Sequence, residues 1–184
     1  MKKEIRTVVY DEELRIEAYC FEGIVQPFPK HFHEYYVIGF IEGGERRLTC
    51  RIREYDICRG DVLLFNPGDS HACVQSDGGV FNYRGFNLSK EVMAELAEEL
   101  TGKKELPGFS ENVIHDKEAV CYLRPLHEMV MEGCAEFGKE ENLLLLLGLL
   151  IQRYGHPFEE CILECGAEIE RACSFMEEHY AEHI

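Results

Sequence analysis

The stretch HFHEYYVIGFIEGG, residues 31–44, decides the fold of this chain. Aromatic and β-branched residues fill it and two glycines end it, a composition typical of a strand that runs into a turn. Side chains alternate between the two faces of a strand, so His31, His33, Tyr35 and Val37 share one face. Phe32, Tyr36, Ile38 and Phe40 are predicted to share the opposite face. Because both faces are largely apolar, the strand fits a closed barrel or a sandwich better than an open sheet.

A second stretch, GDVLLFNPGDSH at residues 60–71, has a turn, a short apolar strand, a Pro-Gly turn and a histidine. Together the two stretches resemble the paired motifs of the cupin barrel. The first motif has His-x-His, then Glu, then Gly; the second has Gly, a Pro-x-Gly or a relative of it, then His. By this resemblance the three motif histidines are His31, His33 and His71. The motif glutamate falls near residues 37 and 38, which are not acidic, and Glu34 comes too early and is expected to point to the opposite face.

The resemblance is closer to one branch of the cupins, the ligand-sensing domain of AraC-type transcription regulators. Residues 29–39 (PKHFHEYYVIG), 60–68 (GDVLLFNPG) and 70–73 (SHAC) are similar to that domain. The resemblance implies an α+β, mainly β, fold: a cupin-like double-stranded β-helix, or jelly-roll barrel, followed by a helical dimerisation region. It also implies a small-molecule effector, a homodimer and a role in transcription.

Three regions are expected along the chain. Residues 1–88 form the effector-sensing barrel, in which 1–13 are an arm or edge strand and further strands lie at 14–23, 45–57, 60–65 and 80–88. Residues 89–165 form the helical dimerisation region. Residues 166–184 resemble the linker helix that opens the DNA-binding half of AraC-type proteins, so DNA contact is expected only through a helix-turn-helix domain that this sequence lacks.

Helical periodicity begins after residue 88. Ser89 is a good N-cap for a helix that ends before Gly102, and Asp116 caps a second helix that runs to about residue 133. Pro125 inside the second helix predicts a kink or a break, because proline has no N–H to donate. A third helix is predicted over residues 140–154.

The third helix contains a run of apolar residues at 143–151, all leucine or isoleucine except Gly148. Such a helix is apolar on every side and is buried on more than one. One interpretation places Leu144, Leu147 and Ile151 in or beside a homodimer contact, because an exposed apolar patch is costly for a monomer. The alternative is that these leucines pack within one chain, under the 166–183 helix.

The composition limits the function. The chain has 184 residues, of which 46% are hydrophobic, so it is long enough for one domain with a sizeable core. Its 35 acidic and 19 basic residues give a net charge of −16, which argues against direct contact with nucleic acid. The nine scattered cysteines indicate reduced thiols in a cytoplasmic protein, with a metal site at Cys161, Cys165 and His156 as a weaker alternative. No apolar run is long enough to span a membrane.

Residues 45–57 alternate between apolar and polar positions, which predicts one half-buried strand with a solvated, arginine-rich face. Leu48, Cys50 and Ile52 are expected to point inward. The five arginines at 46, 47, 51, 53 and 59 are assigned to the solvated surface, although an anionic ligand would also attract them.

Three interpretations compete for His31, His33 and His71. They hydrogen-bond a small organic effector, they bind a divalent metal such as zinc or nickel with water completing the shell, or they bind no ligand at all. Tyr35 on the same face and Tyr83 on a later strand are further ligand-binding candidates. No catalytic residue is identified, so the chain is expected not to be an enzyme. A metal-dependent cupin oxygenase or isomerase is the alternative.

Overall fold

The computed structural model describes residues 4–75, 78–134 and 138–158, together with Arg171, Phe175, Met176 and His179. The linker helix predicted at residues 166–184 and the cysteines of the weaker metal site lie outside the described residues, apart from those four isolated positions. Within the described part of the chain, no helix is both long and apolar enough to cross a membrane.

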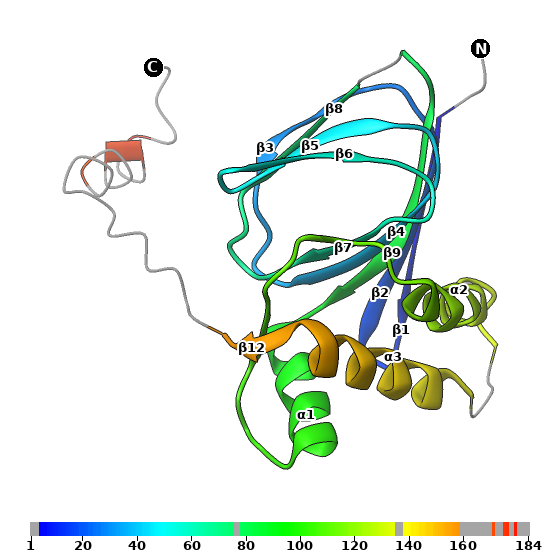
Figure 1. The fold of residues 1–184 in the computed structure, drawn as a ribbon, viewed down its shortest axis with the longest axis vertical. Coiled ribbons are helices and arrows are strands. Elements are labelled where there is room, and N and C mark those ends of the chain that lie inside the picture. The colour runs from blue at the N-terminus through cyan, green and yellow to red at the C-terminus, as the bar shows by residue number, and fades with distance from the viewer. Residues whose placement is uncertain are drawn as a thin grey trace.

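Two antiparallel sheets face each other (Figure 1). The larger sheet has the order β1 (Ile5–Asp11), β2 (Ile16–Ile24), β9 (Phe81–Leu88), β4 (Tyr36–Gly43), β7 (Val62–Phe65) and β11 (Val113–Ile114). The smaller sheet has the order β3 (Phe28–His31), β8 (His71–Gln75), β5 (Arg46–Cys50) and β6 (Arg53–Ile57). From β2 to β9 the chain passes between the two sheets, so that the strands β2-β9-β4-β7 of the larger sheet face the strands β3-β8-β5-β6 of the smaller sheet. This is the strand order of a jelly roll. The predicted α+β, mainly β, cupin-like barrel is confirmed.

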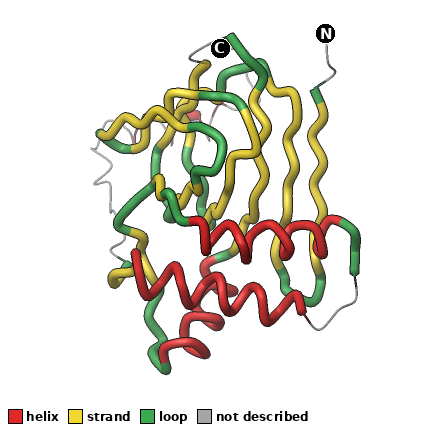
Figure 2. Tube along the Cα trace, turned by 45° about the vertical axis from the view of Figure 1, so that its right-hand side comes forward, coloured by secondary structure: helices red, strands yellow, loops and turns green. Residues whose placement is uncertain are grey.

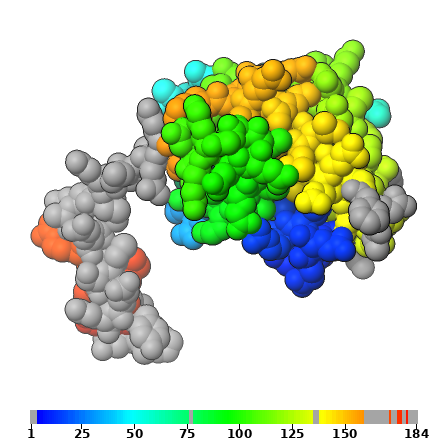
Figure 3. Space-filling view, turned by 90° about the horizontal axis from the view of Figure 1, so that it is seen from below, coloured from blue at the N-terminus to red at the C-terminus, as the bar shows by residue number. Residues whose placement is uncertain are grey.

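Helices cover the outer face of the larger sheet (Figure 2). They are α1 (Lys90–Thr101), α2 (Lys117–Met131) and α3 (Gly138–Tyr154). α1 and α3 lie side by side on one face of the molecule, where α1 is green and α3 yellow to orange (Figure 3). A short ladder of β10 (Pro107–Phe109) and β12 (Gly155–Pro157) joins the loop after α1 to the end of α3.

The helix boundaries follow from capping. The Ser89 side chain accepts a hydrogen bond from the Val92 N–H, and Gly102 ends α1 with a φ of 70°, which suits glycine. Asp116 accepts hydrogen bonds from two N–H groups of the first turn of α2. The break considered at Pro125 is absent, because α2 is continuous across it. Pro125 lies on the exposed side of the helix, where water can reach the carbonyl group that proline leaves without a donor.

The stretch at residues 31–44 is not one strand. β3 ends at His31 in the smaller sheet, β4 begins at Tyr36 in the larger one, and residues 32–35 cross between them. The crossing turns Phe32 outward, where 60% of it is exposed, so its predicted place on a buried face was wrong. Tyr36, Ile38 and Phe40 lie on the helix-covered face as expected.

The predicted strand over residues 45–57 is a hairpin of β5 and β6, with its turn at residues 51–52. Ile52 lies in that turn and is 97% exposed, so its inward assignment was wrong. Arg46 is buried rather than solvated, because it lies on the same inward face as Leu48 and Cys50. A β-turn reverses the chain without a Pro or Gly signal here, because Arg51 itself adopts a φ of 54°.

The leucine run of α3 is mostly internal. Leu143, Leu146, Leu147, Leu149 and Leu150 are buried against α1, α2 and the larger sheet. Leu147 is therefore a core residue of the single chain, so of its two predicted places, in or beside a dimer contact, the first was wrong. Leu144 and Ile151 are half-buried, and Leu145 is 46% exposed.

Candidate functional site

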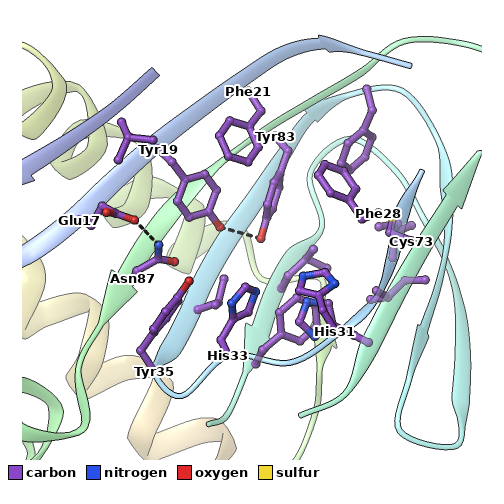
Figure 4. A pocket seen from close by; sticks show the side chains of 18 residues that line it. Glu17, Tyr19, Phe21, Phe28, His31, His33, Tyr35, Cys73, Tyr83 and Asn87 are labelled. Carbon is purple, nitrogen blue, oxygen red and sulfur yellow. Dashed lines mark hydrogen bonds between the residues drawn. The ribbon is translucent and has the colours of Figure 1, made fainter. Parts of the chain in front are cut away.

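A cavity of about 250 Å³ lies between the two sheets. Most of its wall is aromatic or aliphatic, contributed by both sheets and by the crossing segment (Figure 4). Glu17, His33, Tyr35 and Asn87 also line shallower hollows on the surface, so they mark the mouth of the cavity. All five predicted ligand-binding residues line this cavity: His31, His33, Tyr35, His71 and Tyr83.

The structure brings the three predicted histidines together. The ring centroids are 4.9 Å apart for His31 and His33, 4.3 Å for His31 and His71, and 5.2 Å for His33 and His71. One nitrogen from each ring lies within 4.8 Å of the corresponding nitrogens of the other two. His71 also stacks on Phe65 with a centroid separation of 4.0 Å, which fixes its ring plane. The cluster can therefore present three converging nitrogen atoms to one ligand.

Backbone carbonyl groups fix the tautomers of two of these rings. His31 Nδ1 lies 2.6 Å from the Pro29 oxygen, and His71 Nδ1 lies 2.8 Å from the Asp69 oxygen. A carbonyl oxygen only accepts, so each Nδ1 carries the hydrogen and each neutral ring keeps a lone pair on Nε2. Both rings are thereby prepared as acceptors or as metal ligands.

Burial keeps two of the three rings, His33 and His71, neutral. It lowers the pKa of His33 to about 4, with smaller contributions from the neighbouring His71 and His31. Burial also lowers the pKa of His71, although the hydrogen bond to the Asp69 carbonyl opposes the shift. Near neutral pH these two rings therefore act as uncharged imidazoles.

A buried polar network holds the second motif in place. Asp69 accepts hydrogen bonds from the backbone N–H of Asn66 at 3.0 Å and from the Asn112 amide at 2.9 Å. Arg51 donates to its other carboxylate oxygen at 2.5 Å. The N–H of Gly68 donates to the His33 carbonyl at 2.8 Å and so ties the Pro-Gly turn to the crossing segment. This network fixes the backbone that orients His71 and His33, and it is not visible in the motif spacing because Asn112 comes from a distant loop.

Two tyrosines form the floor of the cavity. The Tyr19 hydroxyl donates to the Tyr83 hydroxyl at 2.7 Å, and burial raises the pKa of both side chains. Gly39 and Gly85 are direct partners on neighbouring strands, and their missing side chains make room for the pair. A Cβ on Gly39 would lie 2.3 Å from the Tyr83 hydroxyl, and one on Gly85 would lie 2.5 Å from the Tyr19 hydroxyl.

The sequence reasoning missed the polar pair at the mouth, Glu17 and Asn87. The Asn87 amide donates to Glu17 at 2.5 Å, directly across β2 and β9. The signal was available in the alternation of 17, 19 and 21 on one strand, which puts Glu17 on the same face as Tyr19. At the motif glutamate position, Val37 faces the cavity and Ile38 the helices, so neither supplies a carboxylate, and Glu34 is exposed at the crossing.

The comparisons with known proteins agree with this architecture. The sequence profile of the AraC-like ligand binding domain matches residues 16–150. The chain belongs to this family. It is also 45% identical over 185 residues to an uncharacterized HTH-type transcriptional regulator, YbfI, of Bacillus subtilis strain 168, covering 100% of this chain and 67% of that protein. The family and this relative make the chain the sensing domain of a transcription regulator.

Solved structures similar to this AraC-type domain include a cupin superfamily protein of Desulfitobacterium hafniense, with 17% identity and a TM-score of 0.41 over 48% of this chain and 79% of that one. They also include an RmlC-like cupin family protein of Methanocaldococcus jannaschii with a double-stranded β-helix fold, with 15% identity and a TM-score of 0.42 over 48% of this chain and 83% of that one.

Proposed function

We propose that this AraC-type domain binds a small-molecule effector in the cavity between its sheets and passes the bound state to a DNA-binding domain. The observation that carries the proposal is the cavity itself, with its aromatic wall and its cluster of three imidazoles. Ligand pockets are concave and mostly apolar, with a few placed polar groups, and the pockets of drug-sized ligands occupy about 300–1,000 Å³. A cavity of about 250 Å³ therefore suits a smaller molecule.

A screen of small organic molecules by thermal shift tests this proposal. Compounds that bind the cavity are expected to stabilise the wild-type chain and to lose that effect in Val37→Phe, because Val37 lines the cavity and a phenyl ring would occupy part of it. Val74→Phe is the matched control, since Val74 is 46% exposed on the smaller sheet. Compounds that stabilise both variants equally bind elsewhere, and a screen yielding only such compounds contradicts the proposal.

A divalent metal is the second candidate ligand, favoured by the free Nε2 atoms of His31 and His71 and by the converging third ring. His31, His33 and His71 would hold it, and zinc or nickel suits such a nitrogen site. A bound ion would supply an open coordination position to an effector. Calorimetric titration of chelator-treated protein with zinc is expected to give one site that His71→Ala abolishes. His115→Ala, on an exposed ring outside the cavity, is expected to leave that site intact.

We further propose that the domain has no turnover of its own, with a metal-dependent cupin oxygenase or isomerase as the alternative. Among the described residues, Glu17 is the carboxylate that lines the cavity, and it is engaged with Asn87. An acid or base positioned beside the histidines would be needed for such chemistry. Oxygen consumption by nickel-loaded protein with a diketone or a thiol would favour the enzyme.

We also propose a cytoplasmic homodimer in which α3 contributes to the contact. After the core is accounted for, the exposed Leu145 and the half-buried Leu144 and Ile151 remain available on this helix. A two-fold axis would place the same surface on both subunits. Light scattering of the wild type and Leu145→Glu tests this, and a wild type that is monomeric at micromolar concentration contradicts it.

A further inference from the structure

The polar side of the cavity offers hydrogen-bond acceptors. His31 and His71 each spend their ring N–H on a backbone carbonyl and leave Nε2 as an acceptor. Glu17, at the mouth, is a carboxylate and therefore only accepts when it is ionised. Figure 4 shows Glu17, Tyr35, His33 and His31 along one side of the cavity. A ligand whose polar group is a donor finds an acceptor here in the Glu17 carboxylate. The uncharged His33 ring and the Tyr35 hydroxyl also have hydrogens to donate, so the charge of this side, more than its acceptors, distinguishes between ligands.

The charge of the cavity points the same way. No lysine or arginine among the described residues lines it, and Glu17 contributes a negative charge. Arg46 is buried close by but does not line the cavity. Its guanidinium lies over the Phe81 ring and donates from Nη2 to the Ile24 carbonyl at 2.7 Å, while Nε and Nη1 have no hydrogen-bond partner among the described residues. The whole chain carries a net charge of −16, which raises the local concentration of cations. An anionic effector would therefore enter without a counter-charge.

The walls suit a cation as well as an apolar group. The Glu17–Asn87 pair is flanked by the rings of Tyr19 and Tyr35 (Figure 4). Aromatic faces attract ammonium groups, and a carboxylate beside them strengthens that attraction. The cavity is bounded by the Tyr19 and Tyr83 hydroxyl pair and also by Leu48, Leu63 and Phe81, which offer no polar atom. A polyhydroxylated sugar would leave the hydroxyl groups that face these three apolar side chains without partners, at a cost for each.

We propose that the effector is a small organic amine whose protonated nitrogen binds Glu17 between Tyr19 and Tyr35 and whose aromatic or branched hydrocarbon body fills the cavity. This inference rests on the proposed sensing function and adds the chemical class of the ligand. The nitrogen donates to the Glu17 carboxylate, and the body replaces water against the aromatic wall.

Three probes that share one aromatic body test the class. Benzylamine, benzyl alcohol and benzoate are titrated into chelator-treated protein at pH 7 in a calorimeter. Benzylamine is expected to bind at least about tenfold more tightly than benzyl alcohol, which corresponds to about 1.4 kcal/mol, because hydrogen bonds to charged groups are stronger than hydrogen bonds between neutral groups. Benzoate is expected to bind most weakly.

Glu17→Gln keeps the shape of the side chain and removes its charge. It is expected to weaken the binding of benzylamine by about tenfold and to leave the binding of benzyl alcohol unchanged. Circular dichroism checks that the variant is folded. Glu22→Gln is the matched control, because Glu22 lies on the same strand but outside the lining of the cavity. This variant is expected to bind all three probes as tightly as the wild type does.

Three results would contradict the proposal that the effector is an amine. The first is that benzoate or benzyl alcohol binds as tightly as benzylamine or more tightly. The others are that Glu17→Gln leaves the affinity for benzylamine unchanged, or that benzylamine binds only after zinc is added. If no probe binds while Val37→Phe still blocks other compounds, the amine class fails and the sensing function stands. If no compound of any kind depends on the cavity, both proposals fail together.

Discussion

The two faces of the larger sheet, made by alternate residues of the same strands, have different surroundings. On β4, Tyr36, Ile38 and Phe40 are completely covered by the helices, while Val37 and Gly39 face the other sheet. The helix side is close-packed, and the sheet-to-sheet side contains a cavity of about 250 Å³ bordered by tyrosines and imidazoles. Substitutions on the helix side should therefore act on folding, and those on the cavity side chiefly on binding.

Phe40→Ala tests the helix side and should have the largest effect. Phe40 is 1% exposed and packs near His127 of α2, so its removal leaves a cavity that the helices cannot fill. We expect a loss of about 3–5 kcal/mol in the free energy of unfolding, measured by urea denaturation. Phe32→Ala, at an exposed ring, is the control and should cost under about 0.5 kcal/mol. A loss below about 1 kcal/mol for Phe40→Ala would mean that the helix side is loosely packed.

Asp69→Ala tests the network that supports the cavity side. Its removal leaves the Asn66 and Asn112 amides and Arg51 without their common acceptor. We expect a loss of about 3 kcal/mol, because breaking a buried charged network is costly, together with weaker binding at His71. Urea denaturation and calorimetry measure the two effects.

Asp56→Ala is the matched control for this network. Asp56 pairs with Arg47 on the surface, where 76% of its side chain is exposed. Such pairs contribute about 0–1 kcal/mol, so this variant should behave nearly as the wild type does. Similar losses for the two aspartates would show that the buried network is no more important than a surface ion pair.

Asp11→Asn tests how the edge strand β1 is attached to α3. Asp11 accepts a hydrogen bond from Lys139 at 2.7 Å, and both side chains are almost fully covered. Burial opposes ionisation of Asp11, but hydrogen bonds from the Leu14 N–H and from Lys139 outweigh it, so its pKa lies below the ordinary value. We expect a loss of about 2 kcal/mol near pH 7.

The pH dependence of stability gives the sign of this contribution. A carboxyl whose pKa is lowered in the folded state stabilises the protein above its unfolded pKa of 3.8, and this stabilisation disappears as the pH falls through the folded value. The wild type should therefore lose stability faster than Asp11→Asn as the pH falls below about 4. Parallel acid-denaturation curves for the two proteins would rule out this contribution.

Gly39→Ala tests the cavity side and should have the smallest effect on stability. The added methyl group would meet the Tyr83 hydroxyl at 2.3 Å, so the ring must move into the cavity. Because the cavity can receive it, we expect a loss of only about 1 kcal/mol, at the low end for overpacking, but complete loss of probe binding. Gly43→Ala, on the same strand with its nearest neighbour at 3.4 Å, should retain binding. A large loss of stability in Gly39→Ala without loss of binding would contradict the expectation that substitutions on the cavity side act chiefly on binding.

The sequence was sufficient for the barrel and for the histidine cluster, because both follow from local signals. His31, His33 and His71 were predicted from the resemblance of two short stretches to the cupin motifs. The structure brings them together with Tyr35, although residues 32–35 cross between the sheets and do not alternate as a strand does. Capping residues such as Ser89 and Asp116 predicted the beginnings of the helices correctly.

Features that depend on distant parts of the chain were not predictable in this way. The hairpin turn at Arg51 and Ile52 has no glycine or proline, so alternation was read as one long strand. The leucine run of α3 could not be divided between core and surface until the packing of its neighbours was known. The buried Asp69 side chain accepts a hydrogen bond from Asn112, which is brought there because the next residues, β11, pair with β7 of the larger sheet.

The position of Tyr19 has a mechanical consequence. Its side chain borders the cavity, while its backbone carbonyl points the other way and accepts a hydrogen bond from His127 of α2 at 2.8 Å. His127 is fully buried, and its other ring nitrogen has no partner among the described residues. A ligand that displaces the Tyr19 main chain must therefore carry α2 with it or leave an imidazole without any hydrogen bond in a dry interior. Tyr19 thus connects the cavity to α2, through its side chain on one side of the sheet and its carbonyl oxygen on the other.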